Sequence, residues 1–123
     1  MQDTDELLNR ILRCAEKVHS RMGPGRPEDA YAESLRIEFA DAGITYKHNV
    51  PVPIRFGEGA LGRYHVDFVV EDSVIVEIKT VEQIGQVHEA EILTYLTATG
   101  MRAGLLINFN ARVLSDGIKR ITI

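Results

Sequence analysis

The stretch HVDFVV-EDS-VIVEIK, residues 65–79, contains two short apolar runs separated by a polar triplet. Runs rich in Val and Ile on either side of such a triplet are typical of two antiparallel strands joined by a short turn. If residues 71–73 form the turn, Val70 pairs with Val74, and side chains then alternate between the two faces of each strand. The sequence therefore predicts a β-hairpin here.

One face of this predicted hairpin is polar. Counting back from the turn sets Asp67 opposite Glu77 and His65 opposite Lys79. Two carboxylates directly opposite each other lie roughly 5 Å apart and repel, and a divalent cation between them would remove that repulsion. We interpret the pair as a metal site; the alternative is a solvated strand face with an ordinary Glu–Lys ion pair. The other face is apolar and consists of Val66, Phe68, Val70, Val74, Val76 and Ile78.

The remaining hydrophobic pattern predicts three helices and three further strands around the hairpin. The helices are expected at residues 4–22, 27–43 and 86–99. The strands are expected at residues 44–56, 103–108 and 118–123, with a turn at 57–59. Pro51 and Pro53 place the first of these strands at an edge or make it irregular. The order predicts an α/β fold whose mixed, mostly antiparallel sheet is flanked by helices.

Length and composition limit the class of protein. A chain of 123 residues is expected to form one domain, residues 1–123, with a single core. No apolar stretch approaches the roughly 20 residues of a membrane helix, and the acidic start MQDTDELLNR does not look like a signal peptide. Cys14 is the single cysteine, which favours a reducing, cytoplasmic location. The net charge of −4 is weak evidence against generic nucleic-acid binding.

Several motifs resemble one known family. Asp67 followed by Glu77-Ile78-Lys79 is similar to the D…(D/E)xK signature of the PD-(D/E)XK nuclease superfamily. GRPEDAY (25–31) looks like the GxxExxY motif, which names a small single-domain family within it. Three further segments also look like that family: VHEAEILTYL (87–96), GLLINFN (104–110) and DGIKR (116–120). The resemblance extends over residues 18–120.

The resemblance implies a metal-dependent nuclease with a sheet flanked by helices. Asp67 and Glu77 would then bind Mg²⁺ or Mn²⁺, and the Ile78 carbonyl would be a backbone ligand. Lys79 would orient or activate the attacking water, and Glu28 would bind the metal or a water on it. The implied partner is nucleic acid, in the first place DNA, with RNA and a homodimer left open. The rival reading is an inactive nuclease-fold protein that binds nucleic acid or protein.

One position departs from the related pattern. Related nucleases carry QxxxY on the helix after the ExK motif, whereas this chain has Glu91 before Tyr95. A glutamine can donate a hydrogen bond to a phosphate, but an ionised glutamate cannot. Glu91 would be an extra metal ligand, would be protonated beside Glu77, or would weaken DNA binding. His65 and Tyr31 are accessory candidates, and for Tyr31 a packing role with a tethered hydroxyl is favoured.

Overall fold

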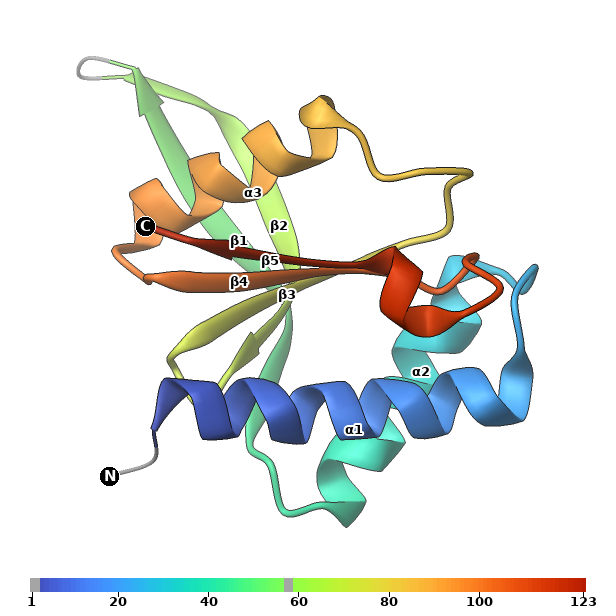
Figure 1. Cartoon of the computed structure of the whole chain (residues 1–123). Helices are drawn as coiled ribbons and strands as arrows, with labels where there is room; N and C mark the ends of the chain where they lie inside the picture. Colours follow the sequence, from blue (N-terminus) through green and yellow to red (C-terminus); the bar gives the residue numbers. More distant parts are fainter. Residues whose placement is uncertain (1–2, 57–58) are drawn as a thin grey trace.

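The computed structural model describes residues 3–56 and 59–123 (Figure 1). Its helices are α1 (Thr4–Met22), α2 (Glu28–Asp41) and α3 (Gln86–Thr99), with a 3-10 helix η1 (Leu114–Gly117). Its strands are β1 (Tyr46–Phe56), β2 (Gly59–Val70), β3 (Val74–Lys79), β4 (Ala103–Asn108) and β5 (Ile118–Thr122). Within the described ranges, no helix combines the length and apolar character that crossing a membrane requires.

The strands form one five-stranded sheet in the order β1-β2-β3-β4-β5. Three neighbouring pairs are antiparallel, and β3 and β4 are parallel because α3 carries the chain back across the sheet. The predicted α/β fold with a mixed sheet is therefore confirmed. β1 lies at the edge, as its prolines indicated, and its pairing with β2 shifts between Pro53 and Arg55. The predicted turn at 57–59 falls mainly outside the described residues.

Helices cover both faces of the sheet (Figure 1). α1 and α2 pack on one face around a core that includes Ile11, Leu35, Phe39, Phe68 and Leu105. α3 packs on the other face around a smaller core that includes Val66, Ile75, Ile92, Leu96 and Leu106. Gly104 allows α3 to lie close to the sheet, because a Cβ there would be 2.7 Å from Ile92 Cδ1.

The predicted hairpin register is correct next to the turn and ends sooner than expected. Val70 pairs with Val74, and the ladder between β2 and β3 stops at Phe68 and Val76. Beyond that point β2 pairs with β1 alone. The strands diverge there, which leaves two positions of the prediction to correct.

Val66 and His65 do not lie where a continued ladder would place them. Val66 pairs with Val50 of β1 and joins the core under α3, not the apolar face of the hairpin. His65 pairs with Pro51 and is exposed, so its predicted position opposite Lys79 is wrong. Both errors have one cause: the prediction extended the hairpin past the residue at which its strands separate.

Candidate metal and catalytic site

Asp67 and Glu77 lie where β2 and β3 separate, one position beyond their last backbone pair. The two side chains take over the hydrogen bonds that the ladder would otherwise make. The Asp67 N–H donates to Glu77 Oε1 at 2.9 Å, and the Ile78 N–H donates to Asp67 Oδ2 at 2.7 Å. The carboxylates are therefore fixed beside each other by the backbone of the opposite strand.

Burial makes this carboxylate pair electrostatically unfavourable. Glu77 is 5% exposed, and burial together with the charge of Asp67 raises its pKa to about 8. Burial also raises the pKa of Asp67, although the Ile78 hydrogen bond and the charge of Lys79 oppose the shift. Removal from water disfavours the charged form of a carboxylate, and a neighbouring carboxylate disfavours it further. A cation between Asp67 and Glu77 would reverse both effects.

Lys79 approaches the carboxylates from the end of β3 and is held by α3. Its Nζ donates to Glu91 Oε1 at 3.0 Å, and its side chain is 17% exposed. Burial alone would lower the pKa of Lys79, but the hydrogen bond and charge of Glu91, with the charges of Glu77 and Asp67, raise it overall. Lys79 is thus held in its charged form beside the carboxylate pair.

Tyr95 lies one turn after Glu91 on α3 and is 6% exposed. Burial and then the charges of Glu91, Glu77 and Asp67 raise its pKa to about 12. Residues four apart share a helix face, and Glu91 and Tyr95 both lie on the side of α3 toward the carboxylates. Its phenol keeps its proton at neutral pH and is a hydrogen-bond donor.

Glu28 opens α2 and borders a cavity of about 290 Å³ that Asp67 and Ile78 also line. Burial and the charge of Asp67 raise the pKa of Glu28. Among the described residues, however, no three acidic, histidine or cysteine side chains converge closely enough to hold a metal ion. Glu28 thus lines the same cavity as Asp67, and the two do not form part of a three-carboxylate cluster among the described residues.

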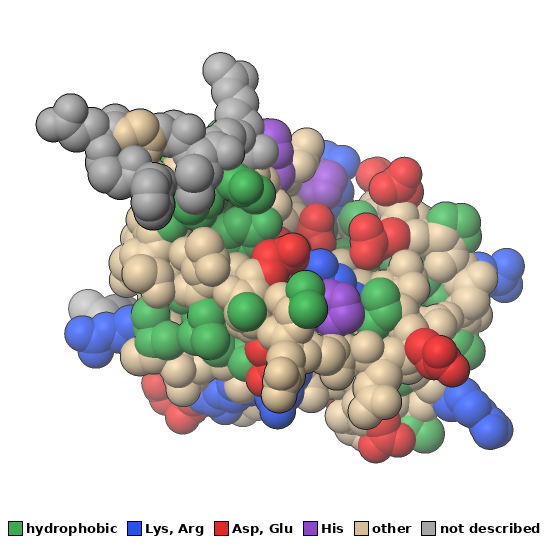
Figure 2. Space-filling model, turned by 90° about the horizontal axis from the view of Figure 1, so that it is seen from above, with side chains coloured by type: hydrophobic (Ala, Val, Ile, Leu, Met, Phe, Trp, Pro, Cys, Tyr) green, Lys and Arg blue, Asp and Glu red, His purple; other side chains and the backbone are tan. Residues whose placement is uncertain are grey.

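His48 also lines this cavity, and the sequence analysis did not single it out. It pairs with Phe68 across β1 and β2, next to Asp67 in the chain. Nothing in the local pattern of a strand interrupted by prolines shows which face His48 occupies, so only the pairing of β1 with β2 reveals it. Figure 2 shows acidic side chains, Lys or Arg side chains and histidines intermixed on the face of the molecule seen from above.

Tyr31 has a structural position. It is fully buried and its ring stacks on Phe109, with centroids 4.6 Å apart. Its hydroxyl donates to the Gly23 carbonyl at 2.5 Å and accepts from the Arg26 N–H at 3.1 Å. These contacts tie the segment between α1 and α2 to the core, which agrees with the packing role favoured for Tyr31.

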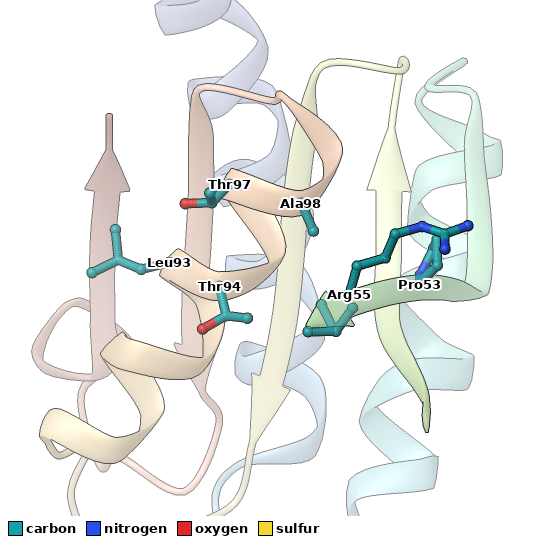
Figure 3. A pocket seen from close by; sticks show the side chains of 7 residues that line it. Pro53, Arg55, Leu93, Thr94, Thr97 and Ala98 are labelled. Carbon is teal, nitrogen blue, oxygen red and sulfur yellow. The ribbon is translucent and has the colours of Figure 1, made fainter. Parts of the chain in front are cut away.

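A larger cavity lies elsewhere, between β1 and α3 (Figure 3). It has a volume of about 610 Å³, and its described lining residues are Pro53, Ile54, Arg55, Leu93, Thr94, Thr97 and Ala98. Figure 3 shows the Arg55 side chain extending past Pro53, away from α3. None of the described lining residues is a carboxylate, so metal chemistry is expected at Asp67 and Glu77 and not in this groove.

The donor set at the end of the hairpin suits a hard divalent cation. Mg²⁺ and Mn²⁺ prefer oxygen ligands, and Mg²⁺ keeps several waters, so two carboxylates with open positions suffice. In the described structure Asp67 Oδ1 and Glu77 Oε2 have no hydrogen-bond partner, since the backbone bonds use the other oxygen of each group. The residues present therefore fit such an ion.

Comparison with known proteins identifies the family of the chain. A family model described as the PD-(D/E)XK nuclease superfamily matches residues 5–121, nearly the whole chain. A comparison with curated proteins found no match. The matched range includes both strands that carry the carboxylates and the helix that holds Lys79. The chain therefore belongs to the PD-(D/E)XK nuclease superfamily.

Proposed function

We propose that this protein is a metal-dependent nuclease of the GxxExxY group that hydrolyses phosphodiester bonds in DNA, with RNA as a further substrate. The observation that carries the proposal is the pair of reciprocal hydrogen bonds by which Asp67 and Glu77 are fixed at the end of the hairpin. Nothing else in the described fold requires a buried and a half-buried carboxylate that repel each other at that point. A catalytic cation would explain their position.

In this proposal Asp67, Glu77 and the Ile78 carbonyl hold Mg²⁺ or Mn²⁺. Such an ion neutralises charge on the phosphate and lowers the pKa of water bound to it. Lys79 donates a hydrogen bond that orients the attacking water and adds positive charge next to the phosphate. Glu28, which lines the same cavity as Asp67, would bind the metal or a water on it.

The test is hydrolysis by purified protein of single-stranded, duplex and branched DNA and RNA, with Mg²⁺, Mn²⁺ or EDTA. We expect cleavage of DNA with either metal and none with EDTA. Lys79→Ala should lower the rate by about 10²-fold or more, the scale of one positioned catalytic group. Lys47→Ala is the matched control, because Lys47 pairs with Asp72 near the hairpin turn. Equal rates in wild type and Lys79→Ala would overturn the mechanism.

A second function is favoured by one observation, the ion pair between Lys79 and Glu91. This contact occupies the lysine that the nuclease mechanism requires. If it persists with substrate bound, the protein is a nuclease-fold module that binds nucleic acid or protein without cleaving it. Metal-dependent binding without hydrolysis, across the same substrate panel, would identify this second function.

A further inference from the structure

Most of the charged side chains that line the cavity beside Asp67 are acidic, and one lining residue is a histidine. Its eight described lining residues are Glu28, Asp29, Ala32, Glu33, His48, Asn49, Asp67 and Ile78. His48 is the one basic residue among them, and Asn49 is the other side chain with an N–H donor. A phosphate that enters this space meets four carboxylates, so each positive charge or donor there contributes strongly to whether the phosphate can bind.

The His48 ring is held in place by its cross-strand partner. His48 pairs with Phe68 across β1 and β2, and the two ring centroids are 4.8 Å apart with an interplanar angle of 33°. Phe68 is fully buried in the core under α1 and α2. Because Phe68 directly follows Asp67, this contact places the imidazole in the lining of the cavity that Asp67 also borders.

His48 and Lys79 approach Asp67 from different sides of the sheet. Lys79 is bound to Glu91 on α3, whereas the His48 ring contacts Phe68, whose side chain belongs to the core under α1 and α2. Both side chains interact favourably with the Asp67 charge. A phosphodiester that lies against Asp67 would have Lys79 on one side and His48 on the other.

We propose that His48 binds the nucleic-acid substrate by donating an imidazole N–H to a phosphate oxygen, on the side of Asp67 opposite Lys79. This inference rests on the proposed nuclease function, and it assigns to β1 a substrate contact that neither the sequence motifs nor the carboxylate pair identify. The neutral imidazole already has one N–H donor, so the contact needs no change of protonation. The tilted contact of the ring with Phe68 positions that donor before substrate arrives.

Two variants of His48 separate the effect of the N–H donor from the effect of the ring, and a third variant is a control. His48→Phe keeps an aromatic ring against Phe68 and removes the donor, while His48→Gln keeps a donor and removes the ring. His65→Phe is the matched control, because His65 is an exposed strand histidine that does not line the cavity. Thermal melting confirms that each variant is folded. Hydrolysis gives kcat/KM in Mg²⁺, and oligonucleotide affinity is measured in a Lys79→Ala background, where cleavage is suppressed.

His48→Phe should lower both oligonucleotide affinity and kcat/KM by roughly tenfold to a hundredfold, the range for a hydrogen bond to a charged group. His48→Gln should retain most of both, and His65→Phe should match wild type. The upward shift of the melting temperature by Mg²⁺ should be unchanged in His48→Phe. Loss of that shift would make His48 a metal ligand and overturn the inference.

The binding measurement separates this inference from the proposed function. If wild type does not cleave oligonucleotide but the Lys79→Ala protein binds it in a His48-dependent manner, the phosphate contact stands and the nuclease function fails. If wild type cleaves and His48→Phe cleaves and binds equally well, the nuclease function stands and the contact fails. If wild type cleaves no oligonucleotide and the Lys79→Ala protein binds none, both fail.

Discussion

Lys79 and Glu91 form an ion pair in which the lysine Nζ lies 3.0 Å from Glu91 Oε1. The pair joins the end of β3 to the middle of α3, and its lysine side is the less exposed, at 17% against 40% for the glutamate. Glu91 therefore positions the charge of Lys79 beside Glu77 and also adds one negative charge where a phosphate would bind. The two effects oppose each other, which makes Glu91 an informative position to change.

Glu91→Gln should raise nucleic-acid affinity several-fold. The amide still accepts a hydrogen bond from Lys79, but one negative charge is removed, and a screened charge near a phosphate contributes on the order of 1 kcal/mol. Fluorescence anisotropy with a labelled oligonucleotide measures the change. Glu89→Gln is the control, since Glu89 lies on the same helix and pairs with Lys119. A weaker metal response in Glu91→Gln would instead show that Glu91 is a metal ligand.

Asp67→Asn and Glu77→Gln should each raise the melting temperature of the metal-free protein. The amide oxygens can keep the backbone hydrogen bonds of the hairpin, while the repulsion between the buried Glu77 and the half-buried Asp67 carboxylates disappears. Both variants should lose the further rise that Mg²⁺ or Mn²⁺ causes in wild type, because a ligand bound only by the folded state stabilises it. Asp72→Asn, at the exposed turn, is the control and should behave as wild type. If Mg²⁺ or Mn²⁺ raised the melting temperature of both site variants as much as that of wild type, Asp67 and Glu77 would not form the metal site.

The metal-free protein should become less stable as the pH rises from about 4.5 to about 8, the unfolded and folded pKa values of Glu77. In this window the folded state binds more protons than the unfolded state, so the free energy of unfolding falls with pH, by at most about 1.4 kcal/mol per pH unit. Urea unfolding at several pH values in EDTA measures the slope. Glu77→Gln should flatten it, whereas Glu16→Gln, on the exposed face of α1, should not.

Tyr31→Phe should destabilise the protein without changing the chemistry. The substitution removes the hydroxyl that joins the Gly23 carbonyl to the Arg26 N–H, a loss of about 1–2 kcal/mol. Urea unfolding measures the change, and kcat per folded molecule should equal that of wild type. Tyr64→Phe, a 42% exposed tyrosine on β2, should alter neither quantity. A large fall in kcat for Tyr31→Phe alone would give its hydroxyl a catalytic role.

Most of the fold was predictable because its signals are local. The polar triplet 71–73 sets the pairing of Val70 with Val74, and the alternation of side chains then places Asp67 near Glu77. The positions that failed, Val66 and His65, depend on where two strands part. That point is decided by the pairing of β2 with β1 and by packing under α3, which no local pattern in the hairpin records.

The site was predictable to the same extent. Asp67, Glu77 and Lys79 belong to one hairpin and share a short motif, and the helical spacing of Glu91 and Tyr95 follows from one element. His48 comes from a strand in which Pro51 and Pro53 interrupt the usual pattern. Its position next to Asp67 depends on the register between β1 and β2, which is a tertiary contact that the local sequence does not show.

The hydrogen bonds at the end of the hairpin also have a consequence for metal selectivity. One oxygen of each carboxylate accepts a hydrogen bond from a backbone N–H, so the other oxygen of Asp67 and of Glu77 is the freer ligand for an ion. In bidentate coordination the hydrogen-bonded oxygen would share its lone pairs between the ion and a strand amide, which weakens both interactions. Ca²⁺ often takes bidentate carboxylates and six to eight ligands, whereas Mg²⁺ takes six at shorter range and readily completes them with water. Because β2 and β3 separate at Asp67 and Glu77, each carboxylate is better suited to bind an ion through one oxygen. This favours Mg²⁺ over Ca²⁺.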